Sequence, residues 1–373
     1  MMIPVNEPIV SKKAKKYVLE TLETGWISSA GKYVTQFEEK FAEYLGVKYA
    51  TTVSNGTTAL HLALEALDIR AGDEIIIPDL TIISCALAAL YTGAKPILVD
   101  VELENGNIDP HLIEKSITKR TKAIMVVHLY GHSVDMDPIL KIARKHNLFI
   151  IEDAAEAHGA EYKGKKAGSM GDIACFSFYG NKIVTTGEGG MVVTNNKKLY
   201  EKACLFKNLA HKPGKRFFHE KVGFNYRLTN IQAAMGLAHL EEIDRFIEKK
   251  LWMKNLYNEL LSDIPFLELP IEQSYAKSVY WMYNLLLTKN SPINRTNFMK
   301  KLKEKGVDTR TYFYPLHTQT VLKNKYHYND KSYPVTNDLS ARGLYLPSGL
   351  AITEHQIKIV SQKIHEVFYE TKR

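Results

Sequence analysis

The sequence predicts an α/β fold with a mostly parallel sheet, followed by a smaller second domain. In the first half, short apolar runs such as EIIIP (74–78) and LFIIED (148–153) alternate with helical patterns. Near-continuous apolar runs are typical of parallel strands that are covered on both faces. With 373 residues, of which 45% are hydrophobic and 24% are charged, the chain has a globular composition and is too long for one small core.

The elements follow in chain order. We expect strands at 49–53, 74–78, 96–100, 123–129 and 148–153, and helices after residue 56, near 81–90 and near 138–146. A long helical pattern begins at Thr229, a suitable N-cap, and runs past Arg245 as a bridge between domains. A strand at 281–287 and helices at 295–305 and 353–369 come after it. These patterns predict a large α/β domain over residues 1–250 and a small α+β domain over residues 251–373.

Composition and charge argue against several classes of protein. No run approaches the roughly 18 apolar residues of a membrane span, and the first residues lack the apolar centre of a secretory signal. Cys85, Cys175 and Cys204 are far apart, which suits a reducing, cytoplasmic compartment. The net charge of +8 is spread along the chain without an aromatic-interleaved basic motif, so nucleic-acid binding is not indicated. An anionic small substrate explains the charge equally well.

Polar residues follow two of the predicted strands, at 49–53 and 148–153, and a further apolar strand that ends at Ser177, and an open parallel sheet binds its ligands at such strand ends. SNGTTA (54–59) leads into a helix, and such a helix N-terminus suits a phosphate, although a simple N-cap also explains it. Asp153 ends a buried strand, where a carboxylate requires a cationic or hydrogen-bonding partner. Lys182 stands in SFYGNKIVTTGEGG (177–190), beside a glycine-rich turn, where a lysine by itself is more often a solvated charge.

Together these three places match the needs of one cofactor. A phosphate cradle, an acid for a ring nitrogen and an amine nucleophile are the groups that pyridoxal phosphate requires of a protein. The stretch HLYGHSVDMD (128–137) also holds two histidines and two aspartates. Their spacing matches no strong zinc pattern, so we expect no metal site there.

The sequence also resembles a known family over nearly its whole length. The matching segments include ATTVSNGTTALHLAL, VVHLYGHSVDMDPI, IIEDAAEAHGA, GDIACFSFYGNKIVTTGEGGMVVTN and VGFNYRLTNIQAAMGLAHLE. They are similar to the DegT/DnrJ/EryC1/StrS sugar aminotransferases, within the fold type I pyridoxal-phosphate enzymes, and most similar to the GDP-perosamine synthase branch. The resemblance implies a seven-stranded, mostly parallel sheet in the large domain, and an enzyme with transaminase activity.

The resemblance assigns a role to each matching position. Lys182 would bind the cofactor covalently and shuttle the proton, and Asp153 would keep the pyridine nitrogen protonated. The other cofactor contacts that it implies are Gly56, Thr57 and Ser177 at the phosphate, Glu156 at the ring oxygen, Ile82 at the ring face, and Asn225, donated across a homodimer interface. Relatives commonly carry an aromatic residue where this chain has Ile82, so aliphatic packing would replace stacking there.

The resemblance implies L-glutamate as the amino donor and GDP-4-keto-6-deoxymannose as the acceptor, in surface polysaccharide biosynthesis. A UDP- or dTDP-linked keto sugar and a small phosphorylated ketone are alternative acceptors. A non-catalytic, pyridoxal-phosphate-binding regulator is the alternative from another class, but a scaffold would not require Lys182, Asp153 and Ser177 as a set. Candidate substrate contacts are His128, Glu188, Lys215, Arg216, Arg310, Tyr314 and His317.

Overall fold

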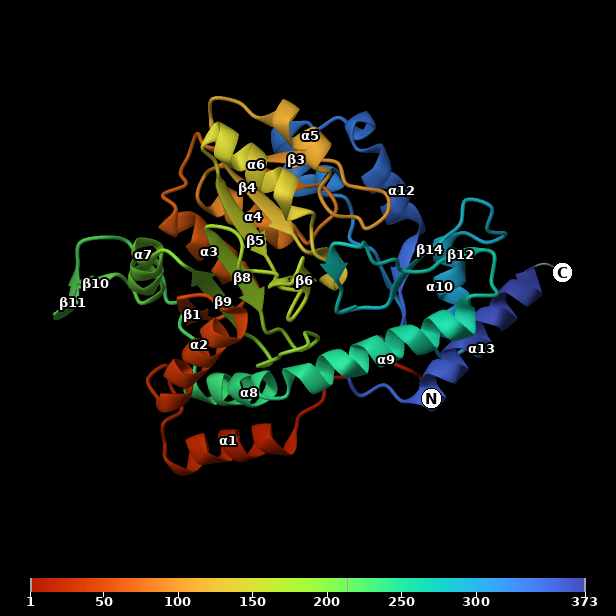
Figure 1. Cartoon of the computed structure of the whole chain (residues 1–373), viewed down its shortest axis with the longest axis horizontal. Coiled ribbons are helices and arrows are strands. Elements are labelled where there is room, and N and C mark those ends of the chain that lie inside the picture. Colours follow the sequence, from red (N-terminus) through yellow and green to blue (C-terminus); the bar gives the residue numbers. More distant parts are fainter. Residues whose placement is uncertain (1, 213, 372–373) are drawn as a thin grey trace.

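A computed structural model describes residues 2–212 and 214–371, except for the side chain of Arg216. A large unit holds a seven-stranded sheet, and a smaller unit lies toward the far end of the long helix α9 (Figure 1). The predicted α/β class, with its mostly parallel sheet, is confirmed.

The seven-stranded sheet has the strand order β1-β9-β8-β5-β4-β2-β3. Only β9 runs antiparallel to its neighbours, so the other six strands end at the same edge of the sheet. In chain order, the strands are β1 (Tyr49–Val53), β2 (Glu74–Pro78), β3 (Lys95–Val99), β4 (Thr121–Val127), β5 (Phe149–Asp153), β8 (Ile173–Ser177) and β9 (Gly190–Thr194). This shared edge is where polar residues from different strands can meet.

Both faces of the sheet are covered by helices. Along β8, Cys175 belongs to an apolar cluster with α3 and α4, whereas Phe176 packs on the opposite face against Phe41 of α2. The helices of this unit are α1 (Lys12–Glu23), α2 (Lys32–Leu45), α3 (Gly56–Ala66), α4 (Ile83–Tyr91), α5 (Pro110–Ile113), α6 (Met136–His146), α7 (Lys197–Lys207) and α8 (Asn230–Leu240). Because the side chains of a strand alternate between its faces, the apolar runs of the sequence serve both layers.

The smaller unit has an antiparallel sheet of strand order β12-β14-β16-β15. Its strands are β12 (Leu267–Glu268), β14 (Asn284–Leu287), β15 (Arg310–Thr311) and β16 (Gly343–Tyr345), and its helices are α9 (Ile243–Leu261), α10 (Arg295–Glu304), α12 (Pro334–Arg342) and α13 (Glu354–Thr371). The helix α11 (Thr320–Tyr326) instead packs on the large unit, because its Leu322 is buried in the apolar cluster of α3 and α4. Ile3 pairs with Val307 and is buried in the same apolar cluster as α9 and α13. The expected boundary at residue 250 falls inside α9, and this division of the chain stays a prediction.

Shorter elements complete the fold. They are β6 (Glu161–Tyr162), β7 (Lys165–Lys166), β13 (Ala276–Lys277), the hairpin strands β10 (His211–Lys212) and β11 (Lys215–His219), and the 3-10 turns η1 (Glu114–Ser116), η2 (Leu129–Gly131), η3 (Leu316–Thr318) and η4 (Asp330–Ser332). The hairpin β10–β11 projects from the large unit at the left of Figure 1.

Two expected elements differ in the structure. The long helical pattern after Thr229 forms two helices, because Glu242 leaves the helical region (φ −115°, ψ 10°) between α8 and α9. The strand expected from residue 281 begins only at Asn284. The backbone N–H of Trp281 instead donates to the carbonyl of Tyr130, and this contact ties the segment to the large unit. The N-cap at Thr229 is confirmed, with Gln232 completing a capping box.

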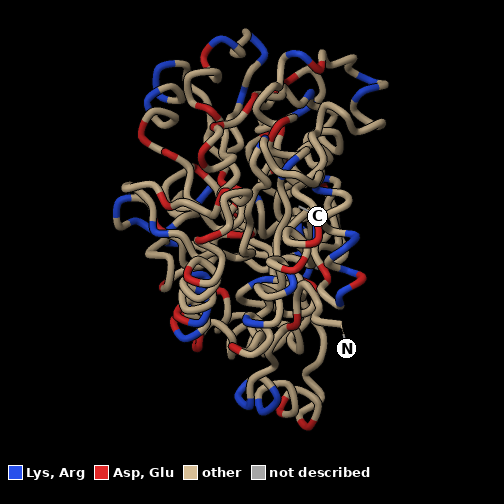
Figure 2. Tube along the Cα trace, turned by 90° about the vertical axis from the view of Figure 1, so that its right-hand side faces the viewer, with Lys and Arg blue, Asp and Glu red and all other residues tan. Residues whose placement is uncertain are grey.

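Charged residues of both signs are interspersed over most of the trace in the side view of Figure 2. In the ranges that the structure describes, no helix combines the length and the apolar character needed to cross a membrane.

Candidate active site

A cavity of about 730 Å³ opens at the carboxyl edge of the large sheet, within the size range of small-molecule sites. Its large-unit wall comes from β5, β8 and the N-terminus of α3, and Trp281, Phe313 and Tyr345 form the opposite wall. Eight of the residues predicted from the sequence line it: Gly56, Thr57, Ile82, Asp153, Glu156, Ser177, Lys182 and Glu188. The sheet edge thus brings together segments that lie far apart in the sequence.

The N-terminus of α3 forms one end of the cavity. Asn55 caps this helix, and its side chain accepts a hydrogen bond from the backbone N–H of Thr58. Ser177 lies so close that a Cβ added to Gly56 would stand 2.8 Å from the serine Cβ, so only glycine fits there. The N–H groups of a first helical turn have no partner within the helix, and they favour an anion. This end is therefore suited to a phosphate.

Asp153 lies at the floor of the cavity and is buried. The thiol of Cys85 donates to its Oδ2 at 3.1 Å, and the backbone N–H of Ala155 donates to its Oδ1 at 3.1 Å. Burial raises the pKa of Asp153 above its ordinary value, whereas the two donors act in the opposite direction. Both donors favour the ionised form, so they offset part of the effect of burial on this carboxylate.

Lys182 and Glu156 form a second polar pair in the cavity. The Nζ of Lys182 lies 3.6 Å from Oε1 of Glu156, and the exposed fractions of the two side chains are 9% and 7%. Burial lowers the pKa of Lys182 and raises that of Glu156 to about 7. Because its pKa is lowered, Lys182 gives up its proton more readily than a solvated lysine does.

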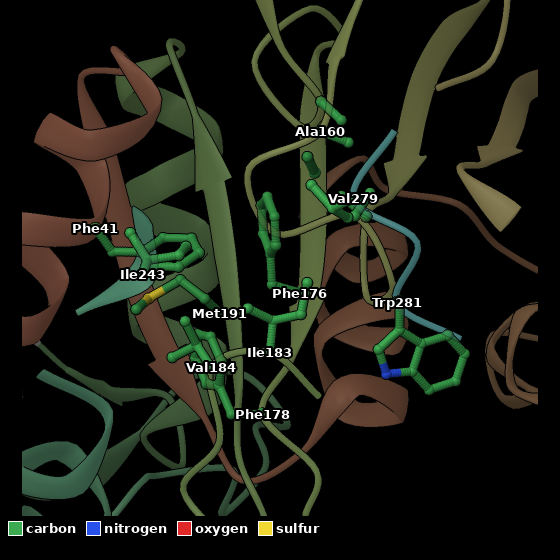
Figure 3. Close-up of a cluster of buried hydrophobic side chains, with 14 of the residues drawn as sticks. Phe41, Ala160, Phe176, Phe178, Ile183, Val184, Met191, Ile243, Val279 and Trp281 are labelled. Carbon is green, nitrogen blue, oxygen red and sulfur yellow. The ribbon is translucent and has the colours of Figure 1, made fainter. Parts of the chain in front are cut away.

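The loop that carries Lys182 is anchored by its next two residues. Ile183 and Val184 are fully buried and pack in the cluster of Figure 3, near Phe176, Phe178 and Met191. Such burial fixes the backbone on one side of the lysine. The side chain of Lys182 lies on the cavity side, with its Nζ 3.5 Å from the centre of the Trp281 ring.

Two histidines predicted as substrate contacts are buried away from the cavity lining. His128 accepts a hydrogen bond from the Val134 N–H at Nδ1, so its Nε2 carries the proton that it donates to Glu152 at 3.0 Å. His317 contacts Asp79 through Nδ1 at 2.6 Å. Both side chains have 0% exposure. Their role in substrate binding stays a prediction. In the structure, each histidine contacts a buried carboxylate, Glu152 or Asp79.

The other predicted contacts are dispersed. Arg310 pairs with Asp308 and lines a smaller hollow beside Asn181 and Tyr345, next to the main cavity. Tyr314 is 62% exposed, whereas the preceding residue, Phe313, lines the cavity. Lys215 lines a separate hollow at the base of the hairpin. The side chain of Arg216 lies outside what the structure describes.

Asn225 does not line the cavity of its own chain. It forms a backbone bridge with Asn208, and its side-chain oxygen accepts a hydrogen bond from Nε of Arg227 at 2.8 Å. Tyr226, the next residue, does line the cavity.

Sequence reasoning missed the second wall of the cavity and one partner of Asp153. Trp281, Phe313 and Tyr345 belong to segments that carry no glycine-rich or helix-start motif, and Cys85 lies within the apolar pattern of α4. The only signal in the sequence was a density of aromatic residues in VYWMY (279–283) and TYFYP (311–315). Among the residues described, no group of three or more metal-binding side chains gathers.

Comparisons with known proteins identify the family of the chain. The model of the DegT/DnrJ/EryC1/StrS aminotransferase family matches residues 8–365. The GDP-perosamine synthase of Escherichia coli O157:H7 is 46% identical over 370 residues, which cover 99% of each chain, and that of Caulobacter vibrioides is 44% identical over 98% of each. The solved structure of the Helicobacter pylori aminotransferase PseC, involved in pseudoaminic acid biosynthesis, is 28% identical, with a TM-score of 0.93 over 99% of this chain and all of that one. The chain therefore belongs to the DegT/DnrJ/EryC1/StrS aminotransferase family and is an enzyme of the sugar aminotransferase type.

Proposed function

We propose that the cavity binds pyridoxal 5'-phosphate and that the chain transfers an amino group from L-glutamate to a keto sugar nucleotide. The observation that carries this proposal is the meeting of Lys182, Asp153 and the α3 N-terminus in one cavity. When bound, the cofactor supplies an electron sink for the carbon that gains or loses the amine. The residues present fit it, since an anion cradle, a buried carboxylate and an amine of lowered pKa face the same space.

Each residue has a separate task in this proposal. Gly56, Thr57 and Ser177 would hold the phosphate, and Asp153 would hold a protonated ring nitrogen, which offsets the cost of burying the carboxylate. Glu156 would lie at the ring oxygen and Ile82 at a ring face, where it packs without stacking.

Lys182 would bind the cofactor covalently. It would then carry a proton between the substrate carbon and the cofactor carbon. A neutral amine is needed for both tasks, and burial favours that form by lowering the pKa of Lys182. Glu156, 3.6 Å away, would accept or return the proton as the lysine changes state.

GDP-4-keto-6-deoxymannose is the acceptor that we propose. Support comes from the two GDP-perosamine synthases, which are 46% and 44% identical to this chain over almost their full lengths. Glu188 lines the cavity, and Arg310 lies beside it with a guanidinium that could bind a diphosphate. The three free cysteines, two of them buried, agree with a cytoplasmic enzyme.

We also propose a homodimer in which each subunit completes the site of the other through Asn225. The hairpin β10–β11 extends away from the body of the chain (Figure 1), and Phe217 and the nearby Val222 are 75% and 84% exposed. Apolar side chains on a projecting arm favour burial against a second copy. Asn225, near the base of this arm, is absent from the lining of its own cavity and would reach the phosphate of the partner.

A single-turnover experiment tests the acceptor. The purified enzyme is converted to its pyridoxamine form with L-glutamate, and keto compounds are then added while the absorbance of the pyridoxal form is followed. Recovery with a GDP-linked 4-keto sugar alone is expected. Recovery only with a UDP- or dTDP-linked sugar or a small phosphorylated ketone would overturn the acceptor, and absence of the initial pyridoxal absorbance in cofactor-loaded protein would overturn the role of Lys182.

A further inference from the structure

Trp281 contacts the surroundings of Lys182 in three ways. The centre of its ring lies 3.5 Å from the lysine Nζ. Its indole Nε1 donates to the carbonyl of Asn181, the residue before the lysine, at 2.8 Å. Its backbone N–H donates to the carbonyl of Tyr130 at 3.1 Å. Figure 3 shows the indole beside the packed cluster, with its nitrogen turned to the side on which Ile183 lies.

Tyr130 extends this network to the second partner of the lysine. Its backbone N–H donates to Oε2 of Glu156 at 2.8 Å, while Oε1 of the same carboxylate faces Lys182. Tyr130 adopts a left-handed conformation (φ 52°), which is rare for an aromatic residue and persists only where the surroundings fix it. Its ring stacks on those of Trp281 and Phe313. The loop that positions Glu156 and the segment of Trp281 are therefore fixed to each other.

Trp281 is itself held from the side of the smaller unit. The Nζ of Lys250, on α9, donates to the carbonyl of Trp281 at 2.8 Å. Trp281 as a whole is only 3% exposed, although it lines the cavity. The ring thus has little freedom to leave Lys182, and its face is presented to the ammonium group rather than to solvent.

We infer that Trp281 is a positioning residue that holds the amine of Lys182 at the cavity wall and stabilises its ammonium form through the face of the indole. The attraction between a cation and an indole face favours the charged lysine, and burial disfavours it. Among the residues that the structure describes, the carboxylates of Glu156 and Asp153 and the imidazole of His158 also act on the amine electrostatically. This inference rests on the proposed role of Lys182.

The test measures the amine in the full-length chain after the cofactor has been removed. Trace acetic anhydride labels neutral amines, and mass spectrometry of the Lys182 peptide across a pH series gives the apparent pKa of this lysine. In Trp281→Leu, the apparent pKa of Lys182 is expected to fall by about half a unit to one unit, because the π face is lost. An unchanged or raised pKa of Lys182 would overturn the inference, even if the cofactor role of this lysine stood.

Two further variants keep the test decisive. Trp281→Phe retains a ring of weaker quadrupole, so the pKa of Lys182 should fall by less than in Trp281→Leu. If Trp281→Leu fails to fold, an unchanged pKa in Trp281→Phe overturns the inference. Trp252 is the matched control, because its ring faces another lysine, Lys249, at 3.6 Å on α9. Trp252→Leu should leave the pKa of Lys182 as in the unmodified chain, and an equal shift there would overturn a local role for Trp281.

Discussion

Lys182 and Lys250 are two buried lysines in contrasting surroundings. Lys182 lies on the wall of a cavity, 3.6 Å from the Glu156 carboxylate, with Asp153 also acting on its charge. Lys250 is 2% exposed and lies on α9, where its Nζ donates to the backbone carbonyls of Trp281 and Ser348. Burial lowers the pKa of both, and it lowers that of Lys250 to about 7.

The contrast shows that a lowered pKa by itself does not identify a functional lysine. A group that reacts also needs open space on one side and charges that respond to its protonation state. Lys182 has the cavity and two carboxylates, whereas Lys250 is enclosed by main-chain acceptors that tie α9 to two loops. We therefore assign chemistry to Lys182 and a structural role to Lys250.

The largest expected effect is the difference in catalytic activity between two variants, one lacking Lys182 and the other lacking Lys250. Lys182→Ala should lower kcat for the proposed amino transfer by about a thousandfold or more, because the proposed covalent attachment and proton transfer would be lost together. Lys250→Met should retain activity within about tenfold, since Lys250 does not line the cavity and contacts Trp281 only at its main-chain carbonyl. Steady-state kinetics of both variants measure this difference.

Circular dichroism of each variant controls for folding. If Lys250→Met were folded and as inactive as Lys182→Ala, the distinction between the two lysines would be wrong.

A smaller effect is expected in the pH dependence of stability. The folded pKa of Lys250, about 7, is below its ordinary value of 10.5, so folding favours the neutral amine. The stability that this lysine contributes is fully present above pH 10.5 and is lost as the pH falls toward 7. Between pH 7 and 9 this linkage amounts to about 2 kcal/mol of unfolding free energy.

Lys250→Met should lack this rise. Urea denaturation of the unmodified chain and the variant at pH 7 and 9 measures the difference between their pH slopes. Equal slopes in the two proteins would show that Lys250 stays charged on its two carbonyl acceptors.

The large-unit wall of the cavity could be predicted because its residues lie at or just after strand ends in continuous motifs. Gly56, Asp153 and Ser177 each occupy such a position, and Lys182 stands in a glycine-rich loop five residues after β8. Local sequence determines where a parallel strand ends, and the sheet then brings these ends to one edge. Lys250, in contrast, lies in EKKLWMKN (248–255), which reads as a solvated helix surface.

The opposite wall depends on contacts between distant segments. Trp281 meets Asn181 across 100 residues, and the side chains of Phe313 and Tyr345 reach the cavity through the fold of the smaller unit. His317 illustrates the same difficulty, because its Nδ1 contacts Asp79, which is 238 residues away in the sequence. No local pattern reports such pairings, so these positions were missed or assigned a contact that the structure does not bring to the cavity.

The smallest effect on activity is expected from the removal of Cys85, the thiol partner of Asp153. This variant tests the surroundings of Asp153, which acts on the charge of Lys182. Its thiol donates to Asp153, whose other oxygen keeps the N–H of Ala155. Because the donor favours the ionised carboxylate, Cys85→Ala should raise the pKa of Asp153 further and move the acid limb of the pH–activity profile to higher pH. A thiol is a weak donor, so at neutral pH we expect a loss in kcat/KM of only about threefold to tenfold.

Cys85→Ser separates the hydrogen bond from the volume of the side chain. The hydroxyl of serine keeps a donor at this position, so its pH–activity profile should stay close to that of the unmodified enzyme, whereas alanine offers no donor. Equal losses in both variants would mean that the sulfur matters by filling the space between α4 and β5. A shift of the acid limb of the pH–activity profile in Cys85→Ala alone would show that the pKa of Asp153 depends on an uncharged neighbour, as we infer for Lys182 and Trp281. No sequence motif reveals this neighbour, because Cys85 lies within the apolar pattern of α4.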